Sequence, residues 1–351
     1  MPLEDALNEV EEADQVDQQR ATIRRLETQL AKAKDRGEQL KQALYDGVRD
    51  AIAAQGPLPT VPLPVLAKAK GRPEIALLHT TDWQASKVTT SYNSQVLAER
   101  LVLLRKRVEK LTEIHRLDHP VDELVIACGG DMIEGLFNYP AQLAQIDATL
   151  FTQWTETSGQ LAELVRWGLS RFKRVQVVAE WGNHGRIGSK RAEVPKNDNF
   201  DRMVYAHAKA LLGKQPRLTW GDCPDDVQRI EIGNYRALLI HGDEFGRSGF
   251  ASPMTIVRHA DRWRSGAFRD TPWANGAPSW EFRDLYVGHY HTHNEWAMAN
   301  GEGTVFQTGS TESDNRYARD GMSASAIPSQ RLHFIDPDKG SITSQYKIPL
   351  A

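Results

Sequence analysis

Cysteine and long apolar runs are both scarce in this 351-residue chain, and each absence excludes a class of protein. The two cysteines, Cys128 and Cys223, lie far apart and form no CxxC pattern, which excludes a disulfide scaffold and a thiolate zinc site. No stretch is long and apolar enough to span a bilayer, and the acidic N-terminus contains no apolar signal core. We therefore expect a cytoplasmic protein that does not engage membranes.

The chain also lacks a large excess of charge of either sign. Its 43 Lys and Arg residues against 46 Asp and Glu residues give a formal net charge of -3. This balance neither requires nor excludes a nucleic-acid partner, because a local basic surface can exist on an acidic protein. The length suits one large domain with an appendage, or two modest domains.

Residues 1–54 carry a heptad pattern that predicts a coiled-coil oligomerisation segment, and hence a homo-oligomer such as a dimer. The seam alternates steps of three and four residues and consists of Val16, Gln19, Ile23, Leu26, Leu30, Ala33, Gly37, Leu40 and Leu44. Gln19 and Gly37 weaken it, which favours a short or locally broken coil. The alternative is a single helix that packs on the rest of the chain through the same stripe.

Residues 55–73 predict an extended, semi-rigid linker, because prolines recur through positions 57–64 and exclude helix. From residue 74 to residue 351 the pattern changes to strands alternating with helices, which is typical of a layered α/β domain. The expected strands are short apolar runs at 75–78, 124–128, 175–179, 236–240 and 285–287. Helical spacing of apolar residues predicts helices over 96–111 and 151–169.

Five polar motifs follow these apolar runs in a fixed order. They are Asp82-Trp-Gln84, Gly129-Gly-Asp131, Gly182-Asn-His184, His241-Gly-Asp243 and Gly288-His-Tyr-His291. Loops at the carboxyl ends of strands in α/β sheets converge on one edge, so residues far apart in sequence can meet there. Carboxylate, amide and imidazole groups together favour transition-metal ions over a calcium cage. A single Gly-Asp is usually only a turn, but five independent turns in this order are hard to explain without a metal centre.

The motif order resembles the calcineurin-like metallophosphoesterase superfamily over residue 74 to the end of the chain. The resemblance implies a four-layer α-β-β-α sandwich, preceded here by the coiled-coil helix, and two divalent cations. We expect Mn²⁺, with Mg²⁺, Fe or Zn as alternatives. It also implies that Asp131 bridges the metals and that His184 is the catalytic histidine. Asp82, Gln84 and His291 would complete the first metal site, and Asn183, His241 and His289 the second.

Two features depart from the superfamily pattern. Gln84 takes a position that is usually His, which weakens the first metal site and resembles the ADP-ribose/CDP-alcohol diphosphatases. The acidic residue that usually follows the Gly-Asn-His motif is replaced by Gly185-Arg186, so either Glu134 or Asp243 would orient His184. Arg186 is expected to bind a phosphate oxygen of the substrate. Gly-Asn-His-Gly-Arg also resembles phage-encoded members, for which the location would be the host cytoplasm.

A segment between the fourth and fifth motifs combines arginines with aromatic residues. It contains Arg258, Arg262, Arg264 and Arg269 with Trp263, Phe268 and Trp273. One interpretation is a basic, aromatic wall that holds a nucleic-acid backbone and stacks a base. The other is an amphipathic helix with Ile256, Val257 and Trp263 inward and the arginines in water.

The leading hypothesis is a dinuclear phosphodiesterase, specifically a nuclease acting on DNA, that resembles the double-strand-break-repair exonuclease branch. The resemblance implies hydrolysis by metal-activated hydroxide, with His184 as the acid. One alternative is a small-molecule nucleotide phosphoesterase, either a diphosphatase or a cyclic-nucleotide phosphodiesterase, which Gln84 favours. Another is a weakly active scaffold that binds nucleic acid, which the weakened first site allows.

Overall fold

The structure is a computed structural model with two compact units, Met1–Gly56 and Pro57–Ala351. It describes residues 56–66, 69–136, 138, 142–187, 198–222, 227–245, 251–267, 281–299, 301–314 and 327–351, with scattered positions between 25 and 54. Every residue of the heptad seam lies outside the described residues, so the coiled coil stays a prediction. In the described part of the chain, no helix has both the length and the apolarity needed to cross a membrane.

The second unit is built on two mixed β-sheets, which places it in the predicted α/β class. The first sheet has the order β11 (Ser341–Pro349), β10 (Ser329–Asp336), β1 (Glu74–Thr80), β2 (Val121–Gly129), β3 (Arg174–Glu180) and β4 (Leu218–Trp220). The second has the order β5 (Gln228–Ile232), β6 (Tyr235–Ile240), β7 (Asp284–Val287), β9 (Thr304–Gln307) and β8 (Asn294–Ala297). Strands β1 to β4 are parallel to one another, and so are β6, β7 and β9. All five strands expected from the sequence are confirmed.

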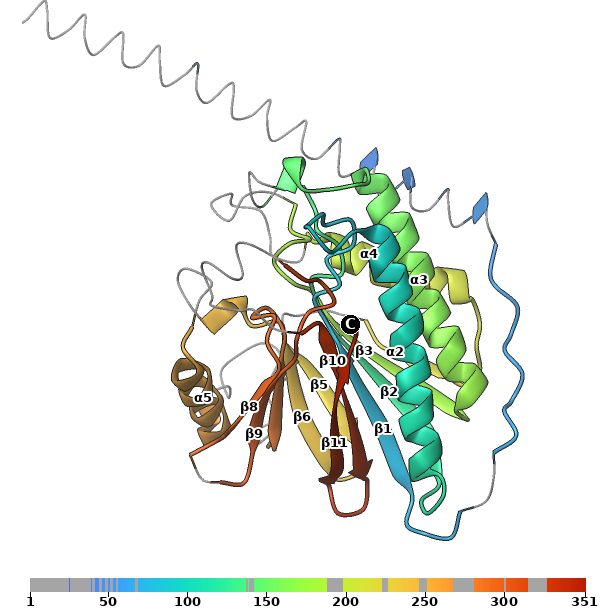
Figure 1. Ribbon diagram of the computed structural model, residues 1–351, viewed down its shortest axis with the longest axis vertical. Helices are drawn as coiled ribbons and strands as arrows, with labels where there is room; N and C mark the ends of the chain where they lie inside the picture. The colour runs from blue at the N-terminus through green and yellow to red at the C-terminus, as the bar shows by residue number, and fades with distance from the viewer. Residues whose placement is uncertain are drawn as a thin grey trace, which may run out of the picture. The chain divides into compact units, whose positions relative to one another are not determined.

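The helices lie on two opposite sides of the sheets (Figure 1). Helices α2 (Ser94–His115), α3 (Leu150–Arg171) and α4 (Phe200–Leu212) are on the side of the first sheet, and α5 (Pro253–Arg262) is on the side of the second. Short helical turns η1 (Gln142–Ala144), η2 (Asp243–Phe245) and η3 (Trp263–Ala267) complete the set of named helical elements. The two helices expected from apolar spacing are confirmed as α2 and α3, α5 corresponds to the amphipathic-helix interpretation of its segment, and α4 is an addition.

Apolar side chains from both sheets form one core between them. Leu77, Val125 and Val178 of the first sheet share a buried cluster with Leu239 and Tyr286 of the second. Burying such side chains stabilises each by roughly 1.5–3 kcal/mol, so this cluster is a major force holding the two sheets together. The parallel strands of both sheets therefore present their carboxyl ends on a rigid base.

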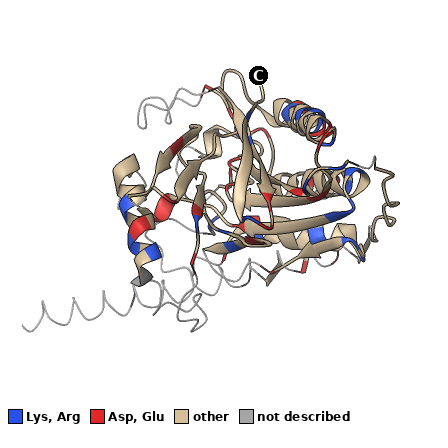
Figure 2. Ribbon diagram, turned by 90° about the horizontal axis from the view of Figure 1, so that it is seen from below, with Lys and Arg blue, Asp and Glu red and all other residues tan. Residues whose placement is uncertain are grey.

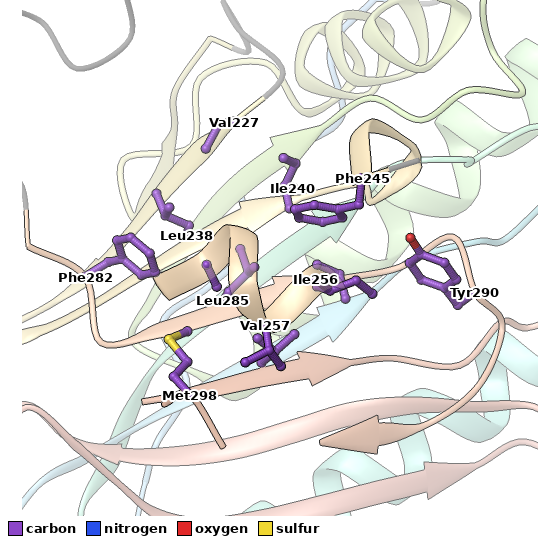
Figure 3. Close-up of a cluster of buried hydrophobic side chains, with 13 residues drawn as sticks. Val227, Leu238, Ile240, Phe245, Ile256, Val257, Phe282, Leu285, Tyr290 and Met298 are labelled. Carbon is purple, nitrogen blue, oxygen red and sulfur yellow. The ribbon is translucent and has the colours of Figure 1, made fainter. Parts of the chain in front are cut away.

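A second core lies between α5 and the other face of the second sheet (Figure 3). Ile256 and Val257 are buried there, and Trp263 packs against the same cluster. Arg258 and Arg262 are exposed, as the amphipathic-helix interpretation expects. Arg269, Phe268 and Trp273 lie outside the described residues.

Residues 58–62 of the predicted linker belong to the second unit and pack on the rest of it. The Leu58 N–H donates to the Leu211 carbonyl at 2.8 Å, and the Val61 N–H donates to Gln215 Oε1 at 3.1 Å. The Arg217 guanidinium donates to the carbonyl oxygens of Val61 and Pro62 at 2.9 Å each. These contacts hold residues 58–62 against α4 and against the segment that leads into β4, the edge strand of the first sheet.

Candidate metal centre

Each predicted ligand follows the carboxyl end of a parallel strand. Asp82, Asp131 and Asn183 come after β1, β2 and β3 of the first sheet. His241 comes after β6 of the second sheet, and His289 and His291 come after β7. The parallel order brings these loops to one edge of each sheet. The structure therefore gathers the predicted residues into two adjoining clusters.

The first of these clusters surrounds His241. Its Nε2 lies 3.0 Å from Asn183 Oδ1 and 3.1 Å from Asp131 Oδ2. Asp131, His241 and His289 each offer a ligand atom, and these atoms lie within 4.8 Å of one another. His241 Nδ1 donates to the Gly129 carbonyl at 2.8 Å, because a carbonyl can only accept. The lone pair of Nε2 is thereby directed at the cluster, as in histidines that bind metals.

The other cluster surrounds His291. Its Nε2 lies 3.3 Å from Asp82 Oδ1 and 3.2 Å from the side-chain nitrogen of Gln84. The Asp82 carboxylate also accepts the His289 N–H, with 3.0 Å to the nearer oxygen. Asp82 therefore contacts residues of both proposed ligand sets. The two sets are also joined through the backbone, because the backbone N–H of Gln84 donates to the Asp131 carbonyl at 2.9 Å.

Two buried acceptor atoms in these clusters fit a cation. Gln84 Oε1 is fully buried and has no hydrogen-bond donor among the described residues, and the equally buried Asp131 Oδ2 has only His241 Nε2 within hydrogen-bonding distance among them. A buried acceptor without a donor costs about 1–3 kcal/mol, and a divalent cation would satisfy both atoms. Oxygen and imidazole donors of this kind suit Mn²⁺ and related ions. The side chains present thus fit the predicted metal ions.

Backbone strain is concentrated at the predicted ligands. The φ angles of Asp82, Gln84, Asp131, His289 and His291 are 51°, 42°, 51°, 64° and 56°. Such left-handed conformations cost about 1–3 kcal/mol each in residues other than glycine. The fold pays this cost at five of the seven predicted metal ligands, which is typical of a functional site rather than of ordinary turns.

Two motif glycines allow the loops to approach closely. A Cβ atom on Gly182 would collide with Asp131 Oδ1, and a Cβ on Gly288 would collide with Thr81 Oγ1 and lie 2.5 Å from Asp82 Oδ2. Only glycine lets these loops reach the carboxylates of the first sheet. This explains why Asn183 and His289, the first ligand of each motif, directly follow a glycine.

The electrostatic environment of the centre favours cations. Burial lowers the pKa of His241, but the Asp131 carboxylate outweighs it and raises the pKa well above its ordinary value. Burial also lowers the pKa of His291, but the nearby carboxylates of Glu312 and Asp82 raise it more, and the net result is a pKa of about 10. The same carboxylates that favour a proton on these histidines would favour a metal ion in its place.

His184 is oriented by Glu134. The Glu134 Oε2 atom lies 3.1 Å from His184 Nδ1, while Nε2 of the ring lies 3.9 Å from Asp131 Oδ2. The sequence left Glu134 and Asp243 open for this role, and the contacts select Glu134. Asp243 instead accepts from the Arg186 guanidinium at 2.7 Å. The acid missing after the Gly-Asn-His motif is thus replaced from the loop that follows Asp131.

Three buried charged residues of the centre were missed by the sequence analysis. Glu312 Oε1 lies 2.5 Å from His291 Nδ1, and Lys87 lies between Glu134 and Glu312. Asp201, at the start of α4, accepts the backbone N–H groups of Asp131, Met132 and Gly182 at 2.8, 3.0 and 2.8 Å. None of them belongs to a motif, and only their burial in the fold reveals them.

Replacing Asp201 by asparagine is expected to destabilise the folded protein by about 1–3 kcal/mol, because an NH₂ group would then face a backbone N–H that has lost its acceptor. Chemical denaturation of the metal-free protein measures this. Asp222→Asn is the matched control, since Asp222 is exposed and, among the described residues, pairs only with Lys209 at 3.3 Å. Equal unfolding free energies for the two variants would show that Asp201 does not hold the loops.

Comparisons with known proteins add a limited likeness. No family model and no curated protein matches the chain. Zinc-complexed Vps29 from Entamoeba histolytica is 12% identical with a TM-score of 0.36, and the match covers 78% of this chain and 99% of that one. A hypothetical protein from Pyrococcus horikoshii is 12% identical with a TM-score of 0.38, covering 78% and 88%. A predicted phosphoesterase from Streptococcus pneumoniae is 12% identical with a TM-score of 0.27, covering 80% and 99%.

At identities of 12–13% and TM-scores below 0.4, these neighbours assign no activity, substrate or metal to this chain.

Proposed function

We propose that this chain is a dinuclear metal-dependent phosphodiester hydrolase with the four-layer α-β-β-α metallophosphoesterase architecture, and that it acts on DNA as a nuclease. The observation that carries the proposal is the convergence of ligand atoms from Asp131, His241 and His289 within 4.8 Å, beside the cluster of Asp82, Gln84 and His291. Two adjoining donor sets, each with carboxylate and imidazole, suit a pair of divalent cations.

Asp131 would be shared between the two ions. Asp82, Gln84 and His291 would hold one ion, and Asn183, His241 and His289 the other, with Mn²⁺ as the proposed metal. When bound, such a pair of ions lowers the pKa of water and stabilises negative charge on a phosphate. The remaining chemistry falls to side chains that do not bind metal.

His184 is proposed as the proton donor to the leaving oxygen. Burial lowers its pKa, but the carboxylates of Glu134 and Asp131 outweigh burial and raise the pKa above its ordinary value, which favours the protonated ring that a proton donor requires. Arg186 would bind a phosphate oxygen: Asp243 holds its Nη2, whereas its buried Nε has no acceptor among the described residues.

Support for a DNA substrate comes from α5 and from the N-terminal segment. Arg258 and Arg262 are exposed one turn apart on α5 and could contact successive phosphates. Figure 2 shows both blue and red turns along this helix. Asp261 lies between the two arginines in the sequence, so the surface is basic only locally. Dimerisation through residues 1–54 would place two active sites along one polymer.

Removing divalent cations with EDTA is expected to abolish hydrolysis of bis(p-nitrophenyl) phosphate, and adding Mn²⁺ back is expected to restore it. In the Mn²⁺-loaded protein, His184→Ala should slow cleavage of DNA by about 10²–10⁴-fold. It should slow cleavage of the nitrophenyl ester less, because nitrophenolate leaves with little help from an acid. Equal losses on the two substrates would contradict the acid role, and turnover that persists in EDTA would contradict the proposed function.

Gln84 supports a second candidate, a small-molecule nucleotide phosphoesterase. A neutral amide oxygen is a weaker ligand than imidazole, and a glutamine at this position resembles the ADP-ribose/CDP-alcohol diphosphatases. Parallel assays on single- and double-stranded DNA, ADP-ribose and cyclic nucleotides separate the candidates. Preference for ADP-ribose or cyclic nucleotides over DNA would replace the nuclease proposal. One metal ion or none per chain, without hydrolysis of any substrate, would favour a scaffold.

A further inference from the structure

A buried lysine connects the two halves of the candidate centre. Lys87 Nζ lies 3.2 and 3.3 Å from the two carboxylate oxygens of Glu134 and 3.8 Å from Glu312 Oε2. The exposed fractions of these side chains are only 7% for Lys87 and 2% for each glutamate. Charged groups are rarely buried this deeply unless they are paired. One ammonium group therefore serves as the counter-charge of two carboxylates.

Each of these carboxylates contacts one histidine of the centre. Glu134 Oε2 lies 3.1 Å from Nδ1 of His184, the proposed proton donor. Glu312 Oε1 lies 2.5 Å from Nδ1 of His291, a proposed ligand of the first metal ion. The five side chains form an unbroken series: imidazole, carboxylate, ammonium, carboxylate, imidazole. Carboxylates behind such histidines set ring orientation and basicity.

We infer that Lys87 is a positioning residue, which sets the orientation of His184 and His291 together. Without its ammonium group, Glu134 and Glu312 would be two buried carboxylates that share no counter-charge, and both would rotate toward other partners. The two imidazoles would then lose their orienting contacts at once. This inference rests on the proposed function, because it gives the two histidines their roles in hydrolysis.

The backbone of Lys87 is held independently of its side chain. Its N–H donates to the Gln84 carbonyl at 3.0 Å, and the residue forms an antiparallel bridge with Ile146. Neighbouring contacts fasten the same loop, since the Glu134 N–H donates to the Ala85 carbonyl at 3.0 Å. Methionine has a chain of similar length without the charge, so Lys87→Met should remove the ammonium group and keep the loop.

The test compares Lys87→Met, Lys87→Arg and Lys173→Met by calorimetric Mn²⁺ titration and by steady-state hydrolysis of bis(p-nitrophenyl) phosphate. Lys87→Met is expected to weaken binding of one of the two Mn²⁺ ions by about 10–100-fold. At saturating Mn²⁺ it should also lower kcat by about 10–100-fold, with little change in KM. Lys87→Arg should recover most of both losses. Lys173→Met is the control, because Lys173 pairs with Asp122 at 2.6 Å on the surface.

Wild-type affinity for both ions and wild-type kcat in folded Lys87→Met would overturn the inference. If that variant does not fold, Glu312→Gln replaces it in the titration, and normal affinity for both ions would then overturn the inference. The titrations also separate this inference from the proposed function. A wild-type protein that binds two Mn²⁺ ions without hydrolysing any phosphodiester fails the proposed function, whereas the effect of Lys87 on metal affinity is still decided.

Discussion

Asp131→Asn is expected to reduce Mn²⁺-dependent phosphodiester hydrolysis by at least about 10³-fold, the effect of losing several kcal/mol of transition-state stabilisation. The physical reason is the position of the carboxylate. Its Oδ2 is fully buried and lies 3.1 Å from His241 Nε2. A neutral amide there would share its single oxygen poorly between two cations.

Asparagine is chosen because it tolerates the left-handed backbone at φ 51° better than other residues of its size. The measurements are kcat at saturating Mn²⁺ and the number of ions bound per chain. We expect two ions in the wild-type protein and no more than one in the variant. Asp222→Asn is the matched control, because Asp222 pairs with Lys209 on the surface and the substitution does not alter the centre. Wild-type turnover in Asp131→Asn would remove Asp131 from its bridging role.

Acidification is expected to destabilise the protein through buried histidines behind the centre. Burial, with smaller contributions from the charges of Arg331, His293 and His241, lowers the pKa of His79 to about 3. His79 Nδ1 lies 2.7 Å from Thr308 Oγ1, and the side chain is fully buried. Burial followed by the Arg331 charge also lowers the pKa of His333 well below its ordinary value.

The direction of the effect follows from proton uptake. The unfolded chain binds a proton at His79 as the pH falls through about 6.5, whereas the folded protein does so only near pH 3. The stability contributed by neutral His79 is therefore complete above pH 6.5 and is lost progressively below it. For this one group the loss is about 2 kcal/mol between pH 8 and pH 5 and approaches about 5 kcal/mol at lower pH.

Urea unfolding at pH 8 and pH 5, in EDTA so that metal binding does not contribute, measures this loss. In His79→Gln the decrease between the two pH values should be smaller than in the wild-type protein by about 2 kcal/mol. His119→Gln serves as the control, because His119 lies on the α2–β2 turn, where it contacts the Arg72 carbonyl. The same decrease in His79→Gln and in the wild-type protein would contradict the assignment to His79.

The convergence of the candidate ligands could be predicted from the sequence, because each of them follows an apolar strand within a short motif. The strand is recognisable as a short apolar run, and the glycines mark where two loops must approach closely. Lys87, Asp201 and Glu312 give no such signal, and Glu134 could be named only as one of two candidates for orienting His184. An isolated charged residue looks the same in sequence whether it lies in water or behind a histidine, and only tertiary packing distinguishes the two cases.

Strand β10 was missed for a related reason. All eight of its residues are buried, yet Gln330, Arg331 and His333 make it resemble an exposed segment. Most of their polar groups have partners inside the protein: Arg331 Nη2, for example, donates to the carbonyl oxygens of Asn294 and Gln307. Polar residues in a buried strand hide it from a prediction based on apolar runs. The heptad pattern, in contrast, was clear in sequence and stays a prediction.

The pairing of β10 with β1 has a consequence for biosynthesis. Strand β1 lies between β2 and β10, and the Thr81 N–H, next to Asp82, donates to the Gln330 side chain at 2.7 Å. Asp82 leaves the ribosome early. Its loop can adopt the folded conformation only after residues 329–336, some 250 positions later, have been translated. Loading with metal would therefore follow translation of this region, and a nascent chain stalled before β10 would carry an incomplete, inactive centre.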